Sequence, residues 1–116
     1  MTRWQQPQVE VEEPFERIDV EQAKQLIQSG EVEIIDVRET DEYQSGHIPG
    51  ARHVPLGELI NNPHKYLTRD NILFVCAVGE RSAVACEVAA AIGLQKLYNL
   101  QGGTMEWIAR GNPVEK

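Results

Sequence analysis

A strand that runs directly into a glycine-containing loop and then a helix is the feature that most constrains this chain. Four consecutive apolar residues, Ile72 to Val75, end at Cys76, and Gly79 and Arg81 follow before an alanine-rich stretch. A short apolar run of this kind is typical of a strand buried on both faces, as in a parallel sheet. The pattern therefore places the Cys76 sulfur at the carboxyl end of a strand, facing the amino end of a helix.

The position of this thiol predicts its chemistry. The N–H groups of such a loop and helix start point inward, and the helix dipole favours negative charge there. A cysteine in this setting has a lowered pKa and reacts as the thiolate, so Cys76 is the predicted nucleophile; the alternative is a buried structural cysteine. Cys86 falls on the predicted helix and is expected to be a small buried apolar residue. No disulfide is expected between the two, because that helix lies between them.

Strands and helices alternate along the rest of the chain. Strands are predicted over residues 32–37, 51–54, 72–75 and 96–100. Helices are predicted from Val20 to a stop at Gly30 and over residues 39–45, 56–60, 81–92 and 104–109, the first with a capping box of Asp19 and Gln22. This order predicts an α/β fold with a central, mostly parallel sheet and helices on both faces. Ligands of such sheets bind at the carboxyl ends of strands, where Cys76 is expected.

The length of 116 residues suits one domain. Residues 1–17 are acidic and contain Pro7 and Pro14, so they are interpreted as a loosely ordered tail. The domain itself is predicted over residues 18–113, and residues 114–116 form the C-terminal end.

Composition narrows the classes of partner. The net charge of −7 argues against a protein that binds nucleic-acid phosphates. No apolar run approaches the length of a membrane span, and the first residues lack the apolar core of a signal peptide, so a cytoplasmic location is predicted. The three histidines fall at no metal-ligand spacing, so neither a metal nor an organic cofactor is expected.

The loop from Cys76 to Arg81 resembles the active-site loop of the single-domain rhodaneses, the thiosulfate sulfurtransferase family. Three further segments resemble signatures of that family in the right order: Ile35-Asp36-Val37-Arg38, Gly46-His47-Ile48-Pro49-Gly50-Ala51, and Leu100-Gln101-Gly102-Gly103 followed by Trp107. The resemblance covers residues 18–113 and implies a rhodanese-like fold.

The resemblance also implies a mechanism. Cys76 would take a sulfane sulfur from a small anionic donor such as thiosulfate, hold it as a persulfide and pass it to cyanide, a thiol or a sulfur-carrier protein. The loop residues would bind the substrate, with N–H groups cradling the terminal sulfur: Ala77, Val78, Gly79, Glu80 and Arg81. Arg81 would orient an anion or pin the loop, and the charge of Glu80 is expected to weaken thiosulfate binding.

Five other motif residues are expected to support the structure rather than react. Asp36 and Arg38 should pair within the fold, with Glu42 as a further candidate partner. His47 is expected to make a structural hydrogen bond rather than to act as a general base. Gly102 and Gly103 should form a turn near the site.

Two alternative functions remain open at this point. Phosphatases or arsenate reductases of the same fold are one class, although the dual-specificity phosphatases have a loop one residue longer than the four residues between Cys76 and Arg81. A non-catalytic interaction module is the other, although silent members of the family usually lack the cysteine.

Overall fold

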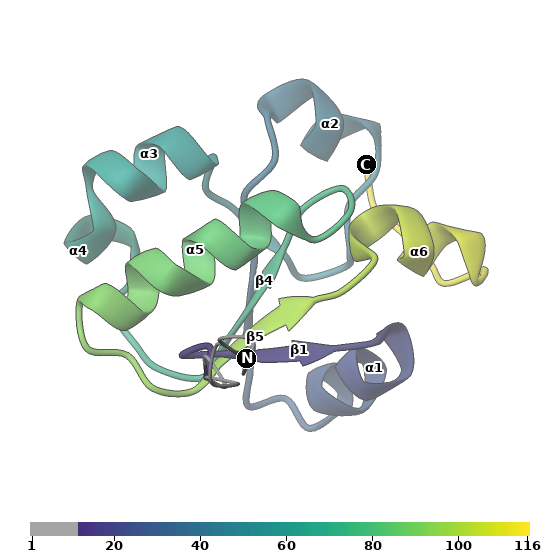
Figure 1. The fold of residues 1–116 in the computed structure, drawn as a ribbon. Helices are drawn as coiled ribbons and strands as arrows, with labels where there is room; N and C mark the ends of the chain where they lie inside the picture. Colours follow the sequence, from purple (N-terminus) through teal and green to yellow (C-terminus); the bar gives the residue numbers. More distant parts are fainter. Residues whose placement is uncertain (1–11) are drawn as a thin grey trace, which may run out of the picture.

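A five-stranded sheet forms the centre of the molecule, in the order β1-β5-β4-β2-β3 with every neighbouring pair parallel (Figure 1). The computed structural model describes residues 12–116. Its strands are β1 (Glu16–Ile18), β2 (Glu33–Asp36), β3 (Arg52–His53), β4 (Ile72–Val75) and β5 (Leu97–Leu100). The predicted parallel α/β sheet is therefore confirmed, and β4 is its central strand.

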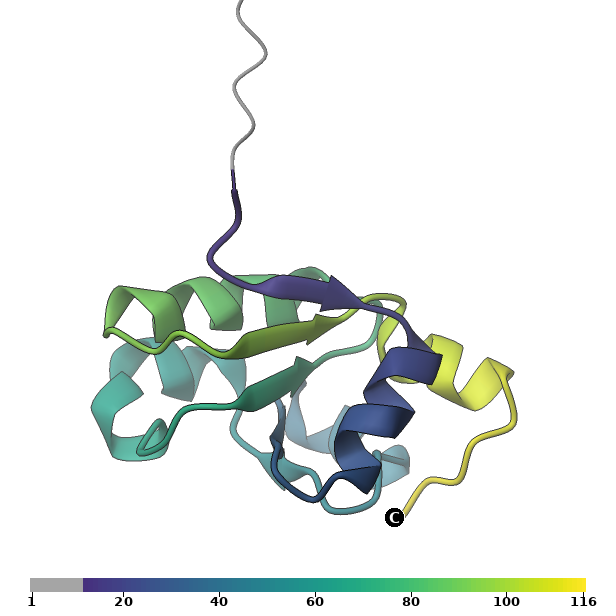
Figure 2. The same ribbon diagram turned by 90° about the horizontal axis from the view of Figure 1, so that it is seen from below.

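Helices cover both faces of the sheet, as predicted. They are α1 (Val20–Gln28), α2 (Thr40–Ser45), α3 (Leu56–Asn61), α4 (Pro63–Tyr66), α5 (Glu80–Ala91) and α6 (Gly103–Ala109). Helices α3, α4 and α5 lie on one face, and α1 and α6 lie on the other (Figures 1 and 2). Within residues 12–116 no helix combines the length and the apolar character needed to cross a membrane.

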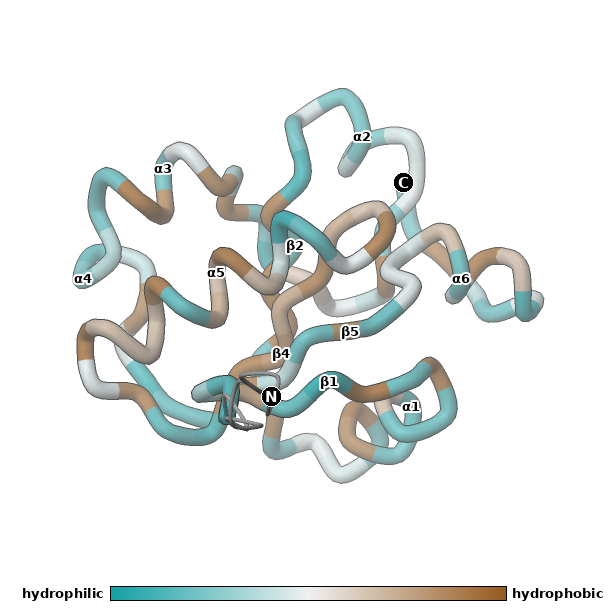
Figure 3. Tube along the Cα trace, in the orientation of Figure 1, coloured by the Kyte–Doolittle hydropathy of each residue, from teal (hydrophilic) through white to brown (hydrophobic). Residues whose placement is uncertain are grey.

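The core follows from the alternation of side chains along the strands. On β4, Ile72 and Phe74 pack under α3 and α5, whereas Leu73 and Val75 pack under α1 and α6. Figure 3 shows the hydrophobic colouring of β4 and the largely hydrophilic colouring of α2. The four apolar residues before Cys76 are thus buried on both faces of the sheet. Their burial holds the carboxyl end of β4, where Cys76 follows, in the middle of the row of strand ends.

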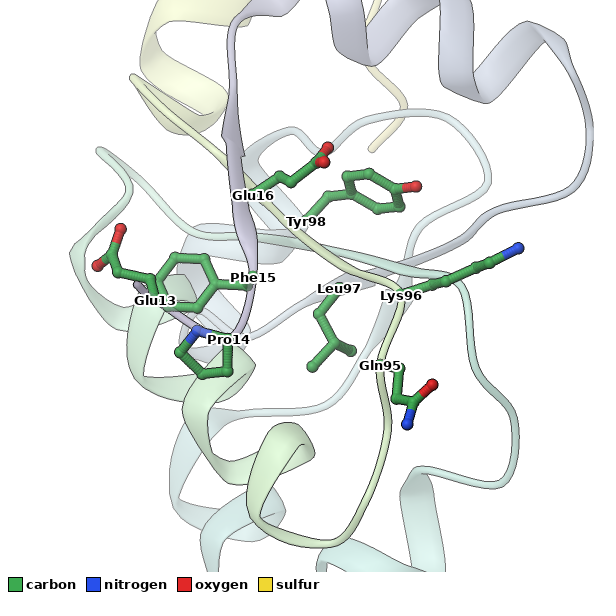
Figure 4. A pocket seen from close by; sticks show the side chains of 8 residues that line it. All are labelled: Glu13, Pro14, Phe15, Glu16, Gln95, Lys96, Leu97 and Tyr98. Carbon is green, nitrogen blue, oxygen red and sulfur yellow. The ribbon is translucent and has the colours of Figure 1, made fainter. Parts of the chain in front are cut away.

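The strand β1 was not predicted. Its residues Glu16 and Arg17 fall in the segment interpreted as a tail, but Glu16 pairs with Tyr98 and Ile18 with Leu100 of β5. A three-residue edge strand with two exposed polar residues carries too little pattern to be recognised. Phe15, just before it, is also buried and helps to line a pocket of about 350 Å³ at the amino ends of β1 and β5 (Figure 4). Residues 1–11 of the predicted tail lie outside the described residues.

Short local structure agrees with the prediction at α1 and adds detail after α3 and at the C-terminal end. The predicted capping box is present, since the Asp19 carboxylate accepts the Gln22 N–H at 2.8 Å. The break after α3 contains the single turn α4, which begins at Pro63. The C-terminal end is tied to the domain, because the backbones of Glu115 and His47 exchange hydrogen bonds of 2.8 and 2.9 Å. Glu115 lies beyond the expected domain boundary at residue 113.

Candidate active site

Cys76 is the first residue after β4 and is almost fully buried, with 1% of its surface exposed. The chain turns through Ala77 and Val78 to Gly79, which adopts a left-handed conformation with φ +102. A Cβ at that position would lie 3.3 Å from the Leu100 carbonyl oxygen. Glycine therefore permits both the turn and the close approach to β5. Helix α5 then begins at Glu80, one residue earlier than predicted.

The thiol sits among hydrogen-bond donors. The Gly79 N–H donates to Cys76 Sγ at 3.1 Å, and Ser82 Oγ lies 3.3 Å from the same sulfur. Burial by itself would raise the pKa of this thiol. The hydrogen bonds from Ser82 and from the Gly79 and Val78 backbone outweigh burial and lower the pKa below its usual value. The direction is the predicted one.

A buried polar network supports this arrangement. Ser82 Oγ contacts both Cys76 Sγ and Asn99 Oδ1, so its single proton can be donated to either atom, and Asn99 Nδ2 donates to the Gly79 carbonyl oxygen at 3.0 Å. Ser82 and Asn99 are both fully buried. The network therefore joins the first turn of α5, the strand β5 and the loop that carries Cys76. Sequence reasoning assigned no role to either residue, although a polar residue inside the otherwise apolar strand β5 is a usable signal.

The start of α6 holds the loop from the other side. The N–H groups of Thr104 and Met105 donate to the carbonyl oxygens of Cys76 and Ala77 at 2.9 and 3.1 Å. Gly103 has φ +61, and a Cβ there would overlap the Ala77 carbonyl oxygen and lie 2.5 Å from that of Cys76. The glycine pair at 102 and 103 thus forms a turn beside the site, where the sequence placed it.

Arg81 is joined to Glu42 of α2. Its guanidinium donates to both carboxylate oxygens, at 2.7 and 2.9 Å. The hydrogen bonds from Arg81 lower the pKa of Glu42 to about 2, and the carboxylate in turn raises the pKa of Arg81. Asp36 and Arg38 pair with each other as expected, but Glu42, the further candidate partner, pairs with Arg81 instead. Glu80 is exposed at the first position of α5.

The remaining motif residues contact one another rather than the Cys76 loop. Arg38 binds the Asp36 carboxylate through Nε and Nη2, at 3.0 and 2.8 Å, and donates to the Gly46 carbonyl oxygen at 2.8 Å. The His47 Nδ1 lies 2.9 Å from the Tyr43 carbonyl oxygen, and the two rings stack with centroids 3.7 Å apart. These contacts fasten the carboxyl end of α2, the helix that carries Glu42.

The arrangement is suited to nucleophilic chemistry at sulfur. Cys76 lies where loop N–H groups and the amino end of α5 meet, so a negative charge on its sulfur or on an atom bonded to it is stabilised. Cys86 lies on the same helix, but burial raises the pKa of its thiol. Of the two free cysteines, only Cys76 combines hydrogen-bond donors with a lowered pKa.

Comparisons with known proteins agree with the motifs. Residues 19–110 match the sequence profile of the rhodanese-like domain. The chain is 36% identical over 94 residues to YrkF of Bacillus subtilis, whose name assigns it provisionally to the sulfur carrier proteins; the match covers 80% of this chain and 51% of that protein. This chain therefore spans about half the length of that relative.

Two further matches cover most of both chains. Thiosulfate sulfurtransferase 18 of Arabidopsis thaliana is 33% identical over 111 residues, which cover 84% of this chain and 81% of the relative. The crystal structure of a rhodanese-related protein from Thermoplasma volcanium is 33% identical and superposes with a TM-score of 0.75 over 86% of this chain and 97% of the other. The chain belongs to the rhodanese-like domain family.

Proposed function

We propose that this rhodanese-like domain is a sulfurtransferase that carries a sulfane sulfur as a persulfide on Cys76. The observation that carries the proposal is the buried thiol at the end of β4, with a lowered pKa and the Gly79 N–H and Ser82 hydroxyl on its sulfur. The names of two relatives, a thiosulfate sulfurtransferase and a provisional sulfur carrier, support the same reaction class.

The first step loads the enzyme. The Cys76 thiolate attacks the outer sulfur of a donor such as thiosulfate, a new S–S bond forms, and the S–S bond of the donor breaks. Sulfite leaves with the electron pair of that bond. The outer sulfur of the resulting persulfide carries the negative charge, which the loop N–H groups between Ala77 and Arg81 are suited to stabilise.

The second step unloads it. An acceptor thiolate or cyanide attacks the outer sulfur, the S–S bond to Cys76 breaks, and Cys76 returns as a thiolate. The product is the acceptor's persulfide or thiocyanate, so the two half-reactions follow a ping-pong course. We expect the protein to work in the cytoplasm, where acceptor thiols are kept reduced.

The surroundings of Arg81 bear on the donor. A small anion must compete with Glu42 for the guanidinium, and it must approach past the exposed carboxylate of Glu80. Both carboxylates should therefore weaken the binding of thiosulfate. The persulfide chemistry is better supported than this particular donor.

Intact mass after incubation with thiosulfate tests the proposal. The reduced protein should gain one sulfur atom, and cyanide should remove it. Cys76→Ser should gain none, whereas Cys86→Ser, a matched change at the other free cysteine, should still be loaded. Loading that follows Cys86 would show that the site is misassigned.

The same preparation separates the alternatives. Hydrolysis of para-nitrophenyl phosphate without uptake of sulfur would favour a phosphatase. Neither activity, in a protein whose thermal unfolding shows a folded domain, would favour a non-catalytic interaction module.

A further inference from the structure

Two exposed apolar side chains belong to segments that adjoin Cys76, namely Val78 in its loop and Met105 at the start of α6. Among residues 12–116 the large hydrophobic residues with substantial exposure are Ile60, Val78, Val84, Met105 and Ile108. All but Ile60 belong to the Cys76 loop or to α5 and α6, and Figure 1 shows the start of both helices meeting α2 at this loop. Val78, 56% exposed, follows Cys76 by two residues, and Met105, 60% exposed, is bonded through its N–H to the carbonyl of Ala77.

The charges around the opening to Cys76 are acidic. Arg81, the arginine of the Cys76 loop, is already paired with Glu42. Three exposed carboxylates at the starts of α5 and α2 have no ion-pair partner among the described residues: Glu39, Asp41 and Glu80. Glu39 lies near enough to raise the pKa of Arg81, so this acidic rim reaches the loop. Such a potential repels anions and attracts cations to the opening.

We propose that the physiological acceptor is a protein whose thiol projects from a surface with apolar contact residues and a lysine- or arginine-rich rim. This inference rests on the proposed function. An apolar centre surrounded by charged residues is the anatomy of a protein interface, and exposed methionine is enriched at such sites. A small thiol gains nothing from Val78 and Met105, and an anionic one is opposed by the rim.

The burial of the sulfur adds a constraint on shape. Because only 1% of Cys76 is exposed, a donor or an acceptor must enter the loop to react, and the acceptor attacks the outer sulfur of the persulfide. The acceptor thiolate attacks that atom, the bond to Cys76 breaks, and the persulfide now belongs to the acceptor while Cys76 keeps the electron pair. The acceptor thiol must therefore lie on a protruding loop or chain end, since a thiol in a flat surface would not reach.

Two synthetic peptides test the choice of partner. Each carries one cysteine between identical leucines, flanked by lysines in one peptide and by glutamates in the other. The persulfide-loaded chain is mixed with each peptide, and loss of sulfur is followed by intact mass. The lysine peptide should react at least about tenfold faster at low ionic strength, and the ratio should shrink as salt is added. Equal rates, or a faster glutamate peptide, would overturn the proposal.

Matched variants locate the effect. Glu80→Lys should reduce the ratio between the peptides, whereas Glu31→Lys, at an exposed carboxylate before β2 on the opposite edge of the sheet, should not. Val78→Ser should slow the lysine peptide relative to 2-mercaptoethanol, and Ile60→Ser, on α3, should not. An equal effect of each control variant would show that the surface around Cys76 is not the docking site.

The outcomes separate this proposal from the one on which it rests. A chain that accepts no sulfur at Cys76 would overturn both. A chain that loads and passes sulfur to 2-mercaptoethanol, but shows no preference between the peptides, would overturn only the docking surface.

Discussion

The carboxylate of Glu42 and the guanidinium of Arg81 are joined by two hydrogen bonds, of 2.7 and 2.9 Å, across 39 residues of sequence. The pair connects α2 to the first turn of α5 and is about one-third exposed on each side. It neutralises the cation that stands closest in sequence to the reactive loop. Both the stability of that loop and the binding of anionic donors should therefore depend on Glu42.

The stabilisation by this pair should disappear in acid. The pKa of Glu42 is about 2 in the folded chain against an ordinary 4.5, so its contribution is complete above pH 4.5 and is lost as the pH falls toward 2. Glu42→Gln should lower the free energy of unfolding at pH 7 by roughly 0.5–1 kcal/mol, the range of a partly exposed ion pair. Denaturant unfolding at a series of pH values should show the difference shrinking below pH 4.5. A difference that stays constant would mean that packing, rather than charge, was lost.

Freeing Arg81 should help an anionic donor. In Glu42→Gln the guanidinium no longer faces a carboxylate, so the KM for thiosulfate should fall by roughly fivefold, as expected for about 1 kcal/mol of attraction at a solvated site. Arg81→Ala should raise this KM, and the double variant should lose the gain. Steady-state cyanide assays measure all three. If KM rises in Glu42→Gln, the carboxylate positions Arg81 for binding instead of competing for it.

Cys76 should ionise below the pKa of a free cysteine. In a Cys86→Ser background, the rate of iodoacetamide labelling should rise with an inflection below about 8.5, because donors around the sulfur favour the thiolate. Ser82→Ala removes one donor and should move the inflection upward. An unshifted inflection in Ser82→Ala would leave the backbone N–H groups as the source of the effect.

The local parts of this site could be predicted from the sequence, and its long-range contacts could not. The strand, loop and helix around Cys76 follow from a four-residue apolar run, a glycine and an alanine-rich stretch, which are patterns of neighbouring residues. Glu42 was a candidate partner of Asp36 and Arg38, which are its neighbours in the chain. Its actual partner, Arg81, approaches only because β2 and β4 lie side by side in the sheet.

The same reason explains the supports that were missed. Asn99 reaches Gly79 and Ser82 because β5 pairs with β4, and nothing in the sequence states that pairing. The strand β1 is too short to show an alternating pattern, and it is ordered by β5 rather than by its own residues. The hydrogen bonds of Asn99 to Ser82 and Gly79 therefore depend on the order of the strands in the sheet, which local sequence motifs do not reveal.

Gly103 should be intolerant of any side chain. It combines φ +61 with carbonyl oxygens of Cys76 and Ala77 where a Cβ would lie, so Gly103→Ala requires the start of α6 to move. We expect a loss of more than about 3 kcal/mol in the free energy of unfolding, because the steric overlap adds to the 1–3 kcal/mol typical of backbone strain alone. Gly93→Ala is the control, since Gly93 has φ +101 but no atom within 4 Å of the added Cβ. Equal losses in the two variants would show that the start of α6 moves to make room for the added Cβ with no loss of stability beyond the backbone strain.

Glu80 should act as a weak brake on dianionic donors. Its carboxylate is exposed at the first position of α5, so water screens it, and a unit charge about 4 Å away is then worth roughly 1 kcal/mol, or close to fivefold in binding. Glu80→Gln should raise kcat/KM for thiosulfate by up to that factor at low salt, and the gain should vanish as salt increases. A neutral donor should respond far less, and Glu31→Gln should leave both donors unaffected. If the turnover of thiosulfate is unchanged by Glu80→Gln across the whole salt range, the carboxylate points away from the path of the donor, and thiosulfate becomes a stronger candidate for the physiological substrate.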